Sequence, residues 1–127
     1  MFQKIACTII LILSVAFASF TTEASDAIDA FIEEVRTPSY DCPSQSLFPQ
    51  LEKTLLGESL STQQRFALTV AKGQFLICRG KYEEAEKMLL KAIMQSNIDE
   101  SSYAFASAIY QIGFSYDARE NPARCKY

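Results

Sequence analysis

The sequence predicts an all-α fold, because three features agree. Apolar residues recur at intervals of three and four along most of the chain, and no segment alternates polar and apolar residues as a half-buried strand does. Capping residues, glycine or proline bound each apolar stretch. The chain has 127 residues, of which 49% are hydrophobic and 21% charged, so one domain with its own core is expected.

The first 18 residues have the features of a secretory signal peptide. Lys4 gives a positive start, residues 5–18 carry no charge, and Ala16-Phe17-Ala18 is a small-residue cleavage signal. We expect cleavage after Ala18 and a periplasmic or secreted domain of residues 19–127. The alternative is an uncleaved anchor, and only in that case do we expect contact with a membrane.

Two helices are expected in the first half of that domain. The first follows Ser25 as N-cap and ends at Thr37-Pro38, and residues 38–46 then form a polar loop. The second helix covers residues 46–56, since Pro49 is tolerated in a first turn and Gly57 ends the helix. The apolar stripes of the two helices are Ile28, Phe31, Ile32 and Val35, and Phe48, Leu51 and Leu55.

The third and fourth helices form a closely linked pair. Ser61 and Gln64 match a capping box, which starts a helix that runs to about Arg79. Gly80 ends this helix, and the next one begins almost at once, so the two helices are expected to be antiparallel. The fourth helix has the apolar stripe Tyr82, Ala85, Met88, Leu89, Ala92 and Ile93.

A fifth helix is expected over residues 101–118, with Asp99 or a neighbouring residue as its cap. Asn121-Pro122 is then a start signal for a further helix, although the chain stops at Tyr127. We therefore expect a domain that lacks its final helix or cap. The fifth helix would bury the stripe Tyr103, Ala106, Tyr110, Gly113 and Tyr116.

The pair of helices resembles a tetratricopeptide repeat. The residues that carry the resemblance are Gly73, Leu76, Gly80, Tyr82, Ala85, Leu89 and Ala92. Phe48, Leu51 and Leu55 lie 34 residues before Tyr82, Ala85 and Leu89, and Gly113 and Tyr116 lie 40 residues after Gly73 and Leu76. The resemblance implies a short solenoid of antiparallel helix pairs, in which these positions pack one helix against the next. A generic helical bundle is the alternative.

A narrower resemblance concerns the order of the parts. A signal peptide followed by degenerate repeats is similar to the periplasmic sensor region of bacterial GGDEF diguanylate cyclases, which adds a transmembrane helix and a cyclase domain. Neither of these occurs in the sequence given. The chain is expected to be a non-catalytic secreted or periplasmic module for protein binding or sensing. A truncated signalling protein and a generic helical secreted protein are the alternatives.

The repeat resemblance also implies a concave groove for a protein or peptide partner. The positions that would line it are Val70, Gln74, Ile77, Cys78, Ser107, Tyr110, Phe114 and Asp117. Any one of the apolar members could instead be a core residue. Apolar residues left without a neighbour on the fifth helix give a second possible interface, self-association through residues 101–118.

The composition argues against catalysis. The chain has no histidine, and its four glycines form no phosphate-binding loop, so we expect no enzyme, cofactor or metal. Glu83, Glu84 and Glu86 occupy a first helical turn, where carboxylates favour the helix dipole. With 12 basic residues against 15 acidic ones, and no basic cluster, nucleic-acid binding is not expected.

After cleavage three cysteines remain, Cys42, Cys78 and Cys125. No two of them have the spacing of a redox or zinc motif. Cys78 and Cys125 are expected to be small packing residues on helices. One structural disulfide is the alternative, and the sequence leaves its three possible pairings open.

Overall fold

The computed structural model describes residues 23–38, 41–95 and 97–123. All regular secondary structure in these ranges is helical, which confirms the all-α class. The predicted signal peptide lies outside the described residues. Among the helices of the described ranges, none combines the length and the apolar character that a membrane span requires.

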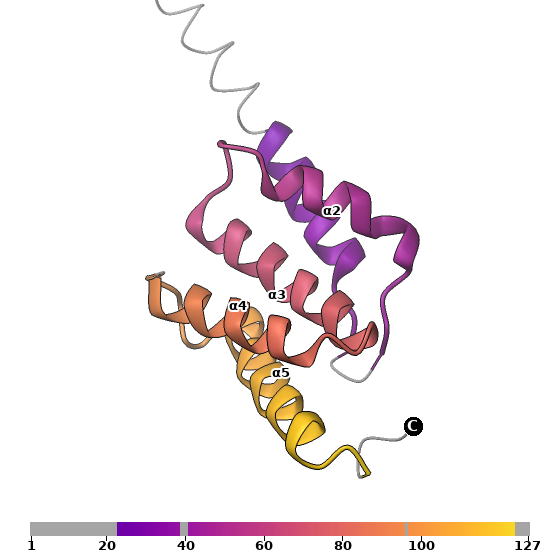
Figure 1. Cartoon of the computed structure of the whole chain (residues 1–127). Coiled ribbons are helices and arrows are strands. Elements are labelled where there is room, and N and C mark those ends of the chain that lie inside the picture. The colour runs from indigo at the N-terminus through magenta and orange to yellow at the C-terminus, as the bar shows by residue number, and fades with distance from the viewer. Residues whose placement is uncertain (1–22, 39–40, 96, 124–127) are drawn as a thin grey trace, which may run out of the picture. The chain divides into compact units, whose positions relative to one another are not determined.

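The chain divides into two compact units, residues 1–31 and 32–127. In the first unit, residues 23–31 are described and are helical. In the second unit a helical segment reaches residue 35, and five elements follow it (Figure 1). They are the 3-10 turn η1 (Gln45–Leu47) and the helices α2 (Phe48–Leu55), α3 (Thr62–Cys78), α4 (Tyr82–Gln95) and α5 (Tyr103–Glu120).

The short helix α2 begins as the sequence predicts and is held by contacts to α3. Pro49 lies in its first turn, where a missing N–H costs no hydrogen bond. At the other end, the Arg65 guanidinium donates to the carbonyl oxygens of Leu55 and Gly57, both at 2.7 Å. Eight residues are too few for an independent helix, so contacts of this kind stabilise α2.

The helices α3 and α4 form the predicted antiparallel pair (Figure 1). The capping box is present. The backbone N–H of Gln64 donates to Ser61 Oγ at 3.1 Å, and the backbone N–H of Ser61 donates to Gln64 Oε1 at 3.0 Å. Gly80 closes α3 with a φ of 72°, a backbone conformation that glycine adopts without strain. The reversal therefore takes only three residues, 79–81.

The core of the second unit lies between α3, α4 and α5. Phe66 and Val70 of α3 pack with Leu89 of α4 and Ala108 of α5, and a second cluster joins Leu76, Ile77 and Ala85. At Gly73 an added Cβ would lie 2.5 Å from Gln111 Oε1 and 3.0 Å from Leu89 Cδ1. The small residue predicted at this point therefore does permit a close approach of three helices.

The helix α5 turns a different face inward from the one predicted. Every member of the predicted stripe, Tyr103, Ala106, Tyr110, Gly113 and Tyr116, is exposed. An added Cβ at Gly113 would have no atom within 4 Å, so this glycine and Tyr116 do not pack against another helix. The close approach to α3 and α4 instead selects small and amide side chains, which are Ser107, Ala108, Gln111, Ser115 and Ala118.

Both ends of α5 also differ from the prediction. Its N-cap is Ser102, whose hydroxyl accepts a hydrogen bond from the Phe105 N–H, whereas Asp99 accepts from Ser101 in the preceding turn. At the other end Asn121 is the C-cap of α5, and its N–H donates to the Asp117 carbonyl at 2.7 Å. The expected further helix would fall mainly on residues 124–127, which lie outside the described ranges.

Candidate functional site

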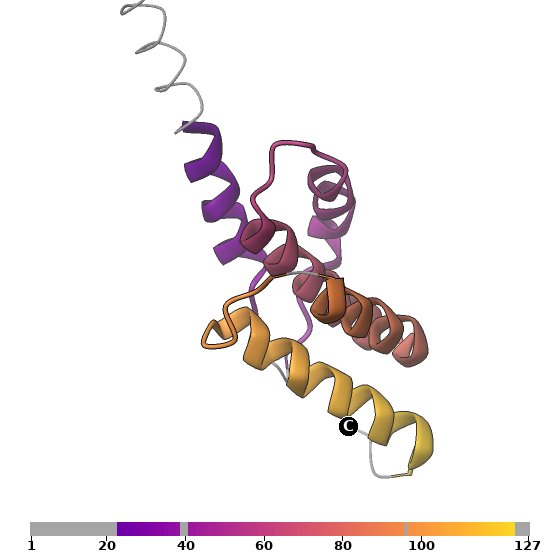
Figure 2. The same cartoon turned by 90° about the vertical axis from the view of Figure 1, so that its left-hand side faces the viewer.

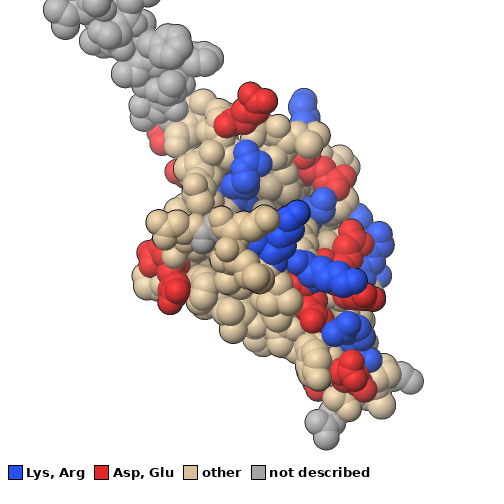
Figure 3. Space-filling view, turned by 60° about the vertical axis from the view of Figure 1, so that its left-hand side comes forward, with Lys and Arg blue, Asp and Glu red and all other residues tan. Residues whose placement is uncertain are grey.

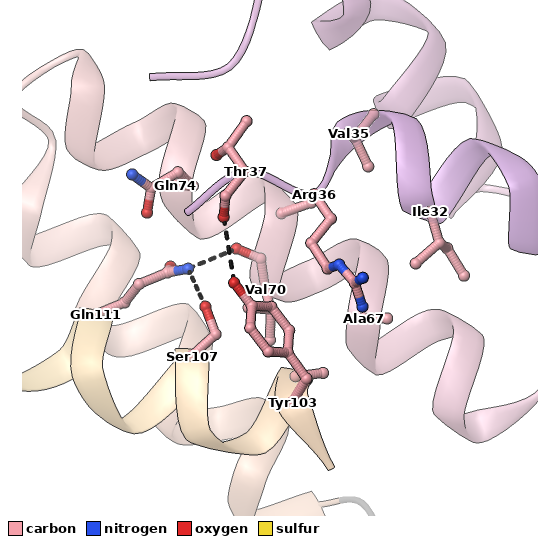
Figure 4. A pocket seen from close by; sticks show the side chains of 12 residues that line it. Ile32, Val35, Arg36, Thr37, Ala67, Val70, Gln74, Tyr103, Ser107 and Gln111 are labelled. Atoms are coloured by element: carbon pink, nitrogen blue, oxygen red, sulfur yellow. Dashed lines mark hydrogen bonds between the residues drawn. The ribbon is translucent and has the colours of Figure 1, made fainter. Parts of the chain in front are cut away.

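A cleft of the second unit lies between residues 32–37, α3 and α5 (Figure 4). Its volume is about 40 Å³, which is far below the roughly 300–1,000 Å³ of pockets that enclose a small-molecule ligand. A few water molecules or one side chain would fill it. The residues that line it include Val35, Arg36, Thr37, Val70, Gln74, Tyr103, Ser107 and Gln111.

The inner end of this cleft is polar. The Gln111 side-chain amide is buried and donates to the Val70 carbonyl at 3.2 Å and to Ser107 Oγ at 3.3 Å (Figure 4). Its own carbonyl oxygen is buried, and no described residue donates a hydrogen bond to it. Gln111 therefore connects α5 to the backbone of α3 across the cleft.

The outer end of the cleft holds a non-helical part of the chain. The Tyr103 hydroxyl donates to the Thr37 carbonyl at 3.4 Å, and the Arg36 guanidinium lies 4.7 Å from the centre of the Tyr103 ring. On the α3 side, the Gln74 side-chain amide donates to the Asp41 carbonyl at 2.8 Å. Side chains of two helices thus bind the backbone carbonyl groups of Thr37 and Asp41.

A disulfide fixes the chain just beyond that segment. Cys42 and Cys78 are bonded, so the alternative of one structural disulfide holds and the packing role expected for Cys78 is wrong. Arg79, next to Cys78, donates to Gln45 Oε1 at 2.9 Å and lies 3.9 Å from the centre of the Phe48 ring. The loop before α2 is therefore tied to the C-terminal end of α3. Cys125 lies outside the described residues.

The structure separates the predicted groove residues into three groups. Val70, Gln74 and Ser107 are buried and line the cleft together. Ile77 belongs to the core cluster with Leu76 and Ala85, so it does not line a groove. Cys78 is bound in the disulfide.

The third group continues along α5 from the cleft. The rings of Tyr110 and Phe114 are stacked with their centres 6.3 Å apart, and Tyr82 meets Phe114 edge-on at 6.2 Å. Tyr110 is 47% exposed, and Phe114 is half-buried against the second core cluster. Asp117 is half-buried and accepts a hydrogen bond from the Asn121 side chain at 3.1 Å.

A second, open hollow lies at the N-terminal end of α4 and contains surface ion pairs. Lys87 contacts Glu83 at 2.6 Å, and Lys81 contacts Glu84 at 3.8 Å. The hydrogen bond and the positive charge of Lys87 lower the pKa of the Glu83 carboxyl. In the described part of the chain, no three histidine, cysteine, aspartate or glutamate side chains are grouped to hold a metal ion.

Nine of the twelve residues that line the cleft were not predicted from the sequence as groove residues, and they include Arg36, Thr37, Tyr103 and Gln111. Arg36 and Thr37 follow the first helix and give no periodic signal. Tyr103 was expected to be buried in a stripe, yet it is half-exposed and hydrogen-bonded to the backbone. Gln111 carried a usable signal, because it is an amide within an otherwise apolar or hydroxyl-bearing stretch, residues 101–116.

Comparisons with known proteins add no relative. No protein-family model matches the sequence, and neither the curated proteins nor the solved structures include a match.

Proposed function

We propose that the chain is a non-catalytic protein-interaction module of the tetratricopeptide type, in which the side of α3 and α5 that carries the cleft binds an extended polypeptide. The observation that supports this most directly is the segment already bound there. Tyr103 and Gln74 hold the backbone carbonyls of Thr37 and Asp41. Contacts to backbone groups accept many sequences, as binding of an extended peptide requires.

The helix arrangement agrees with this proposal. The helix α3 contacts both α4 and α5, as the first helix of one repeat contacts its own partner and the first helix of the next repeat (Figure 2). Gly73 lies at the shared contact, where any side chain would collide with Gln111 and Leu89. The interpretation thus accounts for a residue that a generic bundle does not require.

The partner would bind to the aromatic continuation of the cleft. Arg36 and Thr37 lie at the end near Tyr103, whereas Tyr110 and Phe114 of α5, with Tyr82 of α4, present ring surface farther along. Aromatic rings combine apolar area with few rotatable bonds, so they are common anchors in interfaces. We therefore expect a partner segment with an apolar or aromatic side chain that stacks on Phe114.

The disulfide supports the proposed export. A bond between Cys42 and Cys78 persists in oxidising compartments and is rare in the reducing cytosol. A periplasmic or secreted location, reached through the predicted signal peptide, is therefore part of the proposal.

The test is selection of peptides from a displayed library on the purified, oxidised protein. A selected peptide should bind at least tenfold more weakly to Phe114→Ala and to Tyr82→Ala, while Met94→Ala on α4, 85% exposed, should bind it unchanged. Circular dichroism of each variant identifies loss of fold, and Tyr82 serves as the second site if Phe114→Ala unfolds. Failure to select any peptide, or equal binding by folded variants, would refute the proposal.

A further inference from the structure

The outward face of α5 is an uncharged surface without a neighbour. From Tyr103 to Tyr116 the helix has no charged residue, although Tyr103, Ile109, Tyr110 and Tyr116 are each about half exposed. Figure 2 shows one side of α5 turned away from α2, α3 and α4, and Figure 3 shows a continuous area of uncharged side chains bordered by charged ones. Exposed apolar area of this kind is typical of an interaction surface.

Six residues of this side of α5, which do not include Ile109 and Tyr116, have the spacing of a coiled-coil seam. Steps of three and four residues alternate along the whole helix, which is the pattern that keeps one stripe facing a partner helix. None of the six residues is buried in the structure. We call this set the α5 seam, and its members are Tyr103, Ala106, Tyr110, Gly113, Asp117 and Glu120.

We propose that the α5 seam binds the α5 seam of a second copy of this chain, with the two helices antiparallel and the two-fold axis between Tyr110 and Gly113. In this register each large member of the seam meets a small or charged member of the other copy. Tyr110 packs onto Gly113 of the second copy, where an added Cβ meets nothing within 4 Å in the single chain. The same two-fold operation repeats the contact, as an isologous dimer requires.

The charges favour this register over a parallel one. Asp117 and Glu120 carry the negative charge at the C-terminal end of α5. In the antiparallel pair, Glu120 meets Tyr103 of the other copy, beside the Arg36 guanidinium that lies over that ring and pairs with Glu33 at 2.6 Å. It also lies near the positive end of the other helix dipole. A parallel pair would instead place four carboxylates together.

This inference shares Tyr110 with the proposed peptide site, so the two proposals are tested at other residues. Gly113 belongs to the seam alone, and Phe114 lies on the cleft side, against Tyr82 and Ile77. A variant of Gly113 therefore tests the dimer, while a variant of Phe114 tests peptide binding, so that either proposal can fail without the other.

The first experiment is sedimentation velocity of the purified protein over about a hundredfold range of concentration, in which a dimer must become populated by mass action. Gly113→Lys should raise the dissociation constant at least tenfold. Met94→Lys adds the same charge at an exposed position on α4 and should leave the constant unchanged. A protein that stays monomeric at every concentration, or a dimer that Gly113→Lys does not weaken, would overturn the proposal.

The second experiment tests the register by disulfide formation, in a background with Cys7 and Cys125 replaced by serine. Ala106→Cys and Asp117→Cys should cross-link when the two variants are mixed, since these positions are opposite in the antiparallel pair. Each variant alone should remain uncross-linked. Efficient cross-linking of each variant with itself would show a parallel pair and would overturn the proposed arrangement.

Discussion

The two glycines in α3 and α5 should respond in opposite directions to the same substitution. Alanine in place of glycine in a helix interior stabilises a protein by about 1 kcal/mol, because the unfolded chain loses conformational freedom. At Gly113 the new methyl group would meet nothing within 4 Å. Gly113→Ala should therefore stabilise the monomer by about 1 kcal/mol, or about 4–8 °C in Tm for a domain of this size.

At Gly73 the stabilisation from the same substitution is outweighed by a steric clash. The methyl group would lie 2.5 Å from Gln111 Oε1 and 3.0 Å from Leu89 Cδ1, so the Gln111 side chain must move. Moving it breaks its hydrogen bonds to Val70 and Ser107, each worth about 0.5–1.5 kcal/mol. Overpacking adds about 1–3 kcal/mol, and after the propensity gain we expect a net loss of about 2 kcal/mol.

The assay is thermal unfolding followed by circular dichroism, at a protein concentration low enough that self-association does not contribute. Gly73→Ala should lower Tm by about 10 °C while Gly113→Ala raises it. In a Gln111→Ala background the clash with Oε1 is absent, so Gly73→Ala should cost less there. Equal stabilisation by both alanines would refute the close packing of α3 against α5.

Three further predictions concern stability. Reducing the Cys42–Cys78 bond, which spans 36 residues, should lower the free energy of unfolding by about 4 kcal/mol and lower Tm by more than about 10 °C. A melting curve that dithiothreitol leaves unchanged would contradict a stabilising role for this disulfide. Ser61→Ala removes a capping hydrogen bond and should cost about 1 kcal/mol in urea unfolding, with Ser61→Thr as the near-neutral control. The contact that lowers the pKa of Glu83 stabilises α4 above the ordinary pKa of 4.5 and is lost as the pH falls through the lowered value. A carboxyl titration by NMR should show that lowered pKa, and Lys87→Met should abolish the shift.

The local parts of the fold were predictable because their signals are local. Three such signals act within a few residues of a helix end. The capping box satisfies backbone N–H groups through Ser61 and Gln64, Pro49 lies where no N–H is needed, and Gly80 permits the turn that ends α3. The close approach at Gly73 was also expected, since it follows from a spacing within one helix pair. These features predicted the bounds of α2 and α3, and the start of α4, to within about two residues.

The inward face of α5 could not be predicted in the same way. Five of its eighteen residues are aromatic, and a rule that places large apolar side chains inward selects Tyr103, Tyr110 and Tyr116. Helices that approach closely cannot accommodate rings at the contact, and Ala108, Gln111 and Ser115 occupy it. Only three of the twelve residues that line the cleft were predicted, and for a similar reason, because residues 32–37 enter it through tertiary contacts that no helical period records.

The tyrosines of α5 therefore need an explanation outside the core. Tyr103 and Tyr110 lie seven residues apart on the same side of α5. Tyr103 contacts Thr37 and Arg36, whereas Tyr110 stacks on Phe114 and its other side is exposed. If these exposed positions had no partner, charged residues there would improve solubility at little cost to stability. An uncharged helix between two charged ends is better explained by binding on two sides. A polypeptide would bind at the cleft edge, and a second copy would bind along the seam, where Gly113 offers room for a ring.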